Sequence, residues 1–135
     1  MNAFPTDTQR TLHKAITTAS AGQQISVIDD DAFFRDQIYV LLHGAGFPVR
    51  TYASARHFLA DYVPSAGCLV ADIGLPDIGG MELLEELARR GMDLPVIFTA
   101  GQADISLVVR AMKAGAVDFI QKPLRDDPSN HSIGR

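Results

Sequence analysis

The sequence predicts an α/β domain built on a parallel sheet of five strands. Between Gln24 and Lys122, short apolar runs alternate with longer segments whose apolar residues recur at helical spacing, which is the pattern of repeated βαβ units. The 135 residues, 47% of them hydrophobic, suit one compact domain with a full core. Several apolar runs stop at a charged residue, and ligands of open α/β sheets bind at the carboxyl ends of strands.

Five strands and four connecting helices are expected between these limits. The strands are, in chain order, residues 25–28, 49–52, 68–71, 95 to 99 or 100, and 117–120. The helices are an amphipathic segment from Phe34 to Leu42 that stops at Gly44, a short helix with Ser54 as N-cap, residues 81–90 with Gly91 as C-cap, and a helix that Asp104 caps and Gly115 closes.

Charge and cysteine content exclude several classes of function. The net charge is −4 and no run of Lys or Arg occurs, so we expect this chain to bind neither nucleic acid nor an anionic membrane. Cys68, the single cysteine, lies in an apolar run, which indicates a buried thiol in a reducing compartment. No apolar stretch approaches the roughly 18 residues of a membrane span. The sequence therefore predicts a cytoplasmic protein.

Four charged residues stand where apolar runs stop, and they form the candidate site. Asp29 and Asp30 follow the first expected strand, Asp72 follows the third, and Lys122 follows the fifth. Carboxylate oxygens are the ligands that Mg²⁺ prefers. Two bare carboxylates about 4 Å apart repel by roughly 4 kcal/mol at an effective dielectric of 20, so three need a divalent ion and the ammonium to stay ionised. An ionised Asp72 is then a candidate nucleophile toward phosphorus.

These residues, with their neighbours, resemble the receiver domains of two-component response regulators, most closely the FixJ/NarL-type branch. The matching motifs are Val27–Asp31, Ser54-Ala55 with Phe58-Leu59, Gly67–Asp72 followed by Leu75-Pro76 and Gly80, and Ala111–Pro123. The resemblance covers residues 25 to 123 and implies a flavodoxin-like, doubly wound sheet with strand order 2-1-3-4-5.

The resemblance also implies a role for each residue of the site. Asp72 would accept a phosphoryl group from a histidine kinase, and Lys122 would contact that group. Asp29, Asp30, Asp72 and the backbone carbonyl of Gly74 would hold Mg²⁺. Phosphorylation would then shift a protein interaction surface that a downstream protein, or an output domain outside this chain, reads. A receiver takes part in its own phosphoryl transfer and is not a conventional enzyme.

One departure from the family concerns the switch residues. Receivers place a Thr or Ser that contacts the phosphoryl group where this chain has Ala100. Thr99 lies one residue earlier, and a one-residue offset on a strand turns a side chain to the other face unless a bulge intervenes. Phe119 stands where the family has its switch aromatic. Loss of a hydrogen bond to a charged group, worth about 1.5 to 3 kcal/mol, would weaken switching more than phosphorylation.

The two ends of the chain are a second departure. Residues 124–135 hold few aliphatic residues and a proline, so we expect a mobile tail in place of the helix that closes a receiver. Residues 1–24 form an extension in which Leu12 and Ile16 belong to an apolar stripe between Asp7 and Ser20. We expect this stripe to be a helix that covers the exposed sheet face, in its own chain or a partner's. The alternative is burial of that face in a homodimer.

A second hypothesis for the function follows from these departures. It is a degenerate receiver, a module for protein interaction or dimerisation whose contacts do not depend on phosphate. A haloacid-dehalogenase-like phosphatase also uses an aspartyl nucleophile, but it needs a second Asp where this chain has Gly74, which excludes it.

Overall fold

The computed structural model describes residues 16–17, 23–61 and 67–122, and its central element is a parallel sheet. Five strands lie in the order β2-β1-β3-β4-β5, which confirms the predicted fold class and strand order. The strands are β1 (Ile25–Ile28), β2 (Val49–Tyr52), β3 (Cys68–Asp72), β4 (Val96–Ala100) and β5 (Asp118–Gln121).

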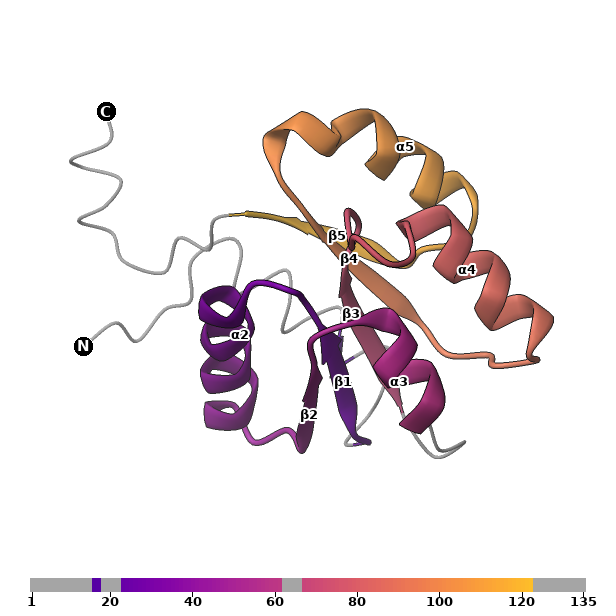
Figure 1. Cartoon of the computed structure of the whole chain (residues 1–135). Coiled ribbons are helices and arrows are strands. Elements are labelled where there is room, and N and C mark those ends of the chain that lie inside the picture. Colours follow the sequence, from indigo (N-terminus) through magenta and orange to yellow (C-terminus); the bar gives the residue numbers. More distant parts are fainter. Residues whose placement is uncertain (1–15, 18–22, 62–66, 123–135) are drawn as a thin grey trace, which may run out of the picture.

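Helices cover both faces of this sheet. They are α2 (Ala32–Gly44), α3 (Ala55–Asp61), α4 (Gly80–Arg89) and α5 (Ile105–Lys113), with the 3-10 turn η1 (Gln102–Asp104) before α5. In the described residues α2 lies on one face, and α3, α4 and α5 lie on the other (Figure 1). The chain winds from one face to the other, as expected for a doubly wound α/β fold.

Each face of the sheet has its own apolar core. The α2 face buries Val27, Val70 and Ile97 against Phe34 and other residues of α2. The opposite face contains the alternate strand residues, which pack against α3, α4 and α5. Alternation of this kind is the period-two geometry of strands. Cys68 is fully buried on the α2 face, as predicted, and its burial raises the pKa of the thiol to about 12.

The ends of the elements differ from the predicted ends by about one residue. Asp72 is the last residue of β3, not the residue after it, because it pairs in register with Thr99. Strand β5 begins at Asp118 and ends at Gln121, one residue later than predicted. Helix α4 begins at Gly80. Element ends depend on individual hydrogen bonds, which periodicity does not specify.

Helix caps confirm several of the sequence predictions. The Ser54 hydroxyl accepts a hydrogen bond from the His57 amide at 3.1 Å and starts α3. Gly91 and Gly115 have φ values of 69° and 117° and follow the ends of α4 and α5, a conformation in which a side chain would be strained.

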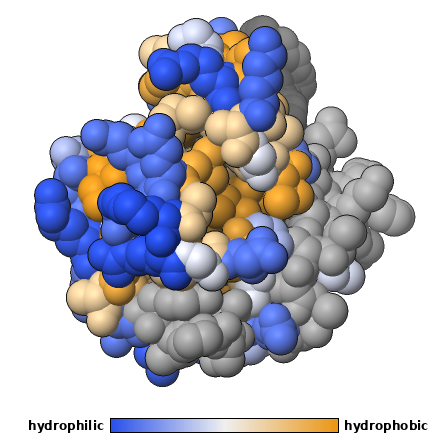
Figure 2. Space-filling view, turned by 90° about the vertical axis from the view of Figure 1, so that its right-hand side faces the viewer, coloured by the Kyte–Doolittle hydropathy of each residue, from blue (hydrophilic) through white to orange (hydrophobic). Residues whose placement is uncertain are grey.

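On the side of the molecule that is at the right in Figure 1, apolar side chains gather near the centre, and polar side chains of the described residues lie mainly to the left and above them (Figure 2). Among the helices of the described residues, none is long and apolar enough to cross a membrane. The predictions for the tail at 124–135, for the final helix and for Leu12 concern residues outside the described ranges.

Candidate functional site

Backbone hydrogen bonds hold three strand ends at one edge of the sheet. The Asp29 amide donates to the Tyr52 carbonyl at 3.1 Å, which joins the ends of β1 and β2. The Ile73 amide donates to the Thr99 carbonyl at 2.9 Å, and the Lys122 amide donates to the Ala100 carbonyl at 2.8 Å. The parallel register that pairs Ile28 with Ala71 joins the end of β1 to that of β3. The ends of β1, β3 and β5 therefore lie along one edge of the sheet although they are distant in sequence.

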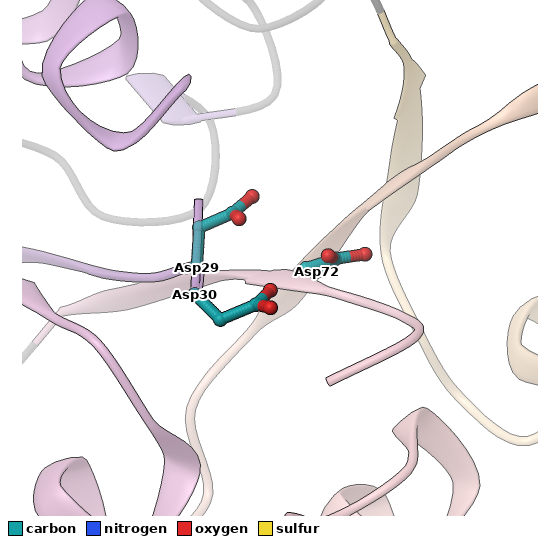
Figure 3. Close-up of side chains that lie close together, drawn as sticks. All are labelled: Asp29, Asp30 and Asp72. Atoms are coloured by element: carbon teal, nitrogen blue, oxygen red, sulfur yellow. The ribbon is translucent and has the colours of Figure 1, made fainter. Parts of the chain in front are cut away.

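Three carboxylates meet at this edge. Asp29, Asp30 and Asp72 each offer an oxygen, and these oxygens all lie within 4.8 Å of one another. The side chains of Asp29 and Asp30 extend from the end of β1 towards the side on which Asp72 lies, at the end of β3 (Figure 3). Asp29 is buried, whereas Asp30 is exposed. The cluster is thus buried at Asp29 and open to solvent at Asp30.

Lys122 supplies the positive charge of the site. Its Nζ lies 2.9 Å from Oδ2 of Asp29 and 3.3 Å from Oδ2 of Asp72. It also lies 4.4 Å from the centroid of the Phe34 ring, a cation–π distance. One ammonium therefore bridges carboxylates from β1 and β3 above an aromatic ring of α2.

Burial and charge change the pKa values of two of these groups in different ways. Burial raises the pKa of the Asp29 carboxyl, and this effect exceeds the lowering by Lys122 and by the Asp31 amide. Burial alone would lower the pKa of Lys122, but Asp29 and Asp72 raise it by more. A buried carboxyl with a raised pKa is the group that gains most from a divalent cation.

Local hydrogen bonds orient the carboxylates. The Asp31 amide donates to Oδ1 of Asp29 at 2.9 Å, and the Gly74 amide donates to Oδ1 of Asp72 at 3.1 Å. Nη1 of Arg35 donates to the backbone carbonyl of Asp29 at 2.6 Å. Each carboxylate keeps other lone pairs for a ligand.

This donor set fits Mg²⁺. It offers only hard oxygen ligands on one side of the site, and Mg²⁺ is commonly bound by one or two carboxylates with waters and phosphate oxygens filling its octahedron. The buried Asp29 is a carboxyl whose burial disfavours its charge, and a cation would compensate for that burial.

The candidate switch residues, Thr99, Ala100 and Phe119, lie where the alternation of strand side chains predicts. Thr99 pairs with Asp72 in an unbroken β3–β4 register, so no bulge turns it towards the other face. The Thr99 side chain is buried, and within the described part of the chain its hydroxyl has no hydrogen-bond partner. Ala100 is fully buried in the core of the opposite face, against which the half-buried Phe119 also packs.

Two supporting residues were missed from the sequence. Asp77 lies in the loop after β3, and its carboxylate accepts hydrogen bonds from the amides of Ala55 and Arg56 at 3.4 and 2.9 Å. It therefore caps α3 from a distant loop. Gly80 lies so close to Ile73 that an added Cβ would be 2.6 Å from Cγ1 of Ile73. Leu75-Pro76 and Gly80 belong to the motifs that match the receiver family, but no local sequence pattern indicates these contacts between distant residues.

Comparison with known proteins identifies the family. The chain matches the response regulator receiver domain over residues 25–131. The transcriptional regulatory protein FixJ of Bradyrhizobium diazoefficiens is 45% identical over 105 residues, which cover 76% of this chain and 51% of FixJ. Nodulation protein W of the same organism is 41% identical over 111 residues, covering 82% and 49%. The chain thus spans about half the length of these relatives.

Solved structures agree with these matches. A crystal structure of full-length FixJ from B. japonicum superposes with a TM-score of 0.70 at 39% identity, over 82% of this chain and 55% of that one. The structure described as FixJ-N has a TM-score of 0.67 at 36% identity, over 83% of this chain and 90% of that one. The chain therefore belongs to the response regulator receiver domain family, and its close relatives are of the FixJ type.

Proposed function

We propose that this receiver takes up a phosphoryl group on Asp72 with the aid of Mg²⁺. The observation that carries the proposal is the meeting of three carboxylates within 4.8 Å beside the Lys122 ammonium. Asp29, Asp30, Asp72 and the Gly74 carbonyl would hold the ion. When bound, Mg²⁺ neutralises the carboxylates and the developing charge on the phosphoryl oxygens.

The chemistry is a displacement at phosphorus. An oxygen of Asp72 attacks the phosphorus of a phosphohistidine on a histidine kinase, the P–N bond breaks, and the imidazole leaves with the electron pair and takes up a proton. The product is an acyl phosphate on Asp72. Lys122, which lies 3.3 Å from Asp72 before transfer, stabilises the new phosphoryl oxygens. The chain takes part in its own phosphoryl transfer and is not a conventional enzyme.

The effect of phosphorylation on the rest of the domain then depends on charge and packing more than on a side-chain hydroxyl at position 100. The side chain of Ala100 has no donor for the phosphoryl group, and Phe119 packs against the core on the Ala100 face. The negative charge of the phosphoryl group draws the Lys122 ammonium away from Asp29. Because Lys122 directly follows β5, this movement shifts the strand. We propose that this shift alters a surface that a downstream protein, or an output domain outside this chain, reads. The proposed location is the cytoplasm.

The alternative is a degenerate receiver that binds a partner or a second copy without phosphate, and the buried Ala100 is the observation in its favour. One experiment separates the two. The protein is incubated with a small-molecule phosphodonor, with Mg²⁺ or with EDTA, and its intact mass is measured. We expect one phosphoryl group on the wild type with Mg²⁺, and none with EDTA or on Asp72→Asn. An unmodified wild type would refute the proposal and favour the alternative.

A further inference from the structure

The hydroxyl of Thr99 is a buried polar group with no hydrogen-bond partner among the described residues. The residue is 1% exposed. An unpaired buried hydroxyl costs free energy, and such groups in native structures often have a functional reason. Valine has a similar shape and would avoid this cost. A partner that reaches the hydroxyl only when the site binds a ligand would account for its presence.

The strand order places Thr99 on the path of the Lys122 side chain. Strand β4 lies between β3 and β5 (Figure 1), and Thr99 pairs in register with Asp72 on one side and with Ile120 on the other. Ile120 belongs to the core on the α2 face, and residues paired in register point to the same face. Lys122 follows β5, and its ammonium reaches Asp72 on β3 beside the Phe34 ring of α2. The stem of the lysine therefore crosses the end of β4 on the face to which the Thr99 hydroxyl points.

A divalent ion at the carboxylates would compete for the oxygens that Lys122 contacts. Oδ1 of Asp29 accepts a hydrogen bond from the Asp31 amide, and Oδ1 of Asp72 accepts one from the Gly74 amide. Oδ2 of each carboxylate, at 2.9 and 3.3 Å from the ammonium, is therefore the oxygen with more room for an ion. Mg²⁺ and an ammonium repel each other and compete for the same oxygens. The ammonium must then leave at least one carboxylate and needs another acceptor within reach of its stem.

We propose that Thr99 is a positioning residue whose hydroxyl oxygen accepts a hydrogen bond from the Lys122 ammonium when Mg²⁺ occupies the carboxylates. A neutral hydroxyl has lone pairs for this donor and adds no negative charge that would compete for the metal. The bond keeps the ammonium beside Asp72, where a phosphoryl group would arrive. This role rests on the proposed function, because it requires a metal at the carboxylates.

A double-mutant cycle of Mg²⁺ affinity, measured by calorimetry on the full chain, tests this role. Thr99→Val should not destabilise the metal-free protein, but it should weaken Mg²⁺ binding about tenfold or more, the size of one lost hydrogen bond to a charged group. Thr99→Ser keeps the hydroxyl and should bind Mg²⁺ within about twofold of the wild type. In the Lys122→Met background, Thr99→Val should change the affinity by no more than about twofold, because the ammonium is absent.

A second measurement leaves Lys122 unchanged. At saturating Mg²⁺, nuclear magnetic resonance should show that the Lys122 ammonium protons exchange with water several-fold faster in Thr99→Val than in the wild type or in Thr99→Ser. Equal exchange in all three proteins, or an equal loss of Mg²⁺ affinity with and without Lys122, would overturn the role of Thr99. A wild type that binds no Mg²⁺ would overturn the metal site of the proposed function, and the role of Thr99 with it.

Discussion

Replacement of Lys122 by methionine removes the only ammonium that bridges the site carboxylates in the described residues. Nζ lies 2.9 Å from Asp29 and 3.3 Å from Asp72, so each attraction is about 5 to 6 kcal/mol at an effective dielectric of 20. These gross values overstate the loss, because Asp29 can take up a proton. Protonation of a carboxyl with an ordinary pKa of about 3.9 costs about 4 kcal/mol at pH 7. We therefore expect the free energy of unfolding without metal to fall by about 3 to 4 kcal/mol.

The loss of unfolding free energy in Lys122→Met should depend on pH, in a direction that follows from the pKa shifts of Asp29 and Lys122. The raised pKa of Asp29 lets it protonate as the pH falls, and the unpaired charge in the variant then disappears. The raised pKa of Lys122 means that its contribution is fully present below its unfolded value and is lost as the pH rises through its folded value. The difference between wild type and variant should therefore be largest near neutral pH and shrink towards both extremes.

Urea unfolding in EDTA and in Mg²⁺ measures these effects, with Lys113→Met, a change at an exposed lysine of α5, as the control. Mg²⁺ supplies the positive charge that the variant lacks, so it should stabilise Lys122→Met by more than it stabilises the wild type. A loss below about 1 kcal/mol, typical of a surface ion pair, would refute the assignment of Lys122 to the site. Equal stabilisation of the wild type and of Lys122→Met by Mg²⁺ would refute the idea that Mg²⁺ and Lys122 interact with the same carboxylates.

Three further predictions concern the metal, the loop and the switch. Mg²⁺ competes with a proton at Asp29, so its affinity, measured by calorimetry, should fall as the pH falls through the raised pKa of that carboxyl; a flat profile down to about pH 4 would contradict this. Gly80→Ala should cost about 1 to 3 kcal/mol in urea unfolding, because its Cβ would meet Ile73 at 2.6 Å. Gly79→Ala, whose Cβ finds an ordinary 3.5 Å contact, serves as its control, and an equal cost would be the contrary result. Thr99→Val should leave stability unchanged or raise it by about 1 kcal/mol, because the buried hydroxyl has no partner in the described residues; a clear loss of stability would reveal a bond to that hydroxyl.

The core of the site was predictable because its residues stand at strand ends. Asp29, Asp72 and Lys122 each follow or end an apolar run, and a parallel sheet brings such ends to one edge. The alternation of strands likewise predicted that Thr99 and Ala100 face opposite cores.

The parts that sequence reasoning missed depend on contacts between distant residues. Nothing near Asp77 in the sequence indicates that it caps α3, and nothing near Arg35 indicates that its guanidinium reaches the Asp29 carbonyl. The apolar stripe that contains Ile16 was expected to cover the exposed sheet face, and Ile16 is buried in the same core cluster as Ile97 and Ile120. Periodicity indicates which residues are buried, but it does not identify their individual partners.

The central claim is that Asp72 is the residue that accepts the phosphoryl group. The full chain is treated with a small-molecule phosphodonor and Mg²⁺, the acyl phosphate is reduced with borohydride to homoserine, and the site is located by tandem mass spectrometry of peptides. We expect homoserine at position 72 alone, and none when Mg²⁺ is withheld. Reduction at Asp29 or Asp30, or no reduction at any aspartate, would contradict it.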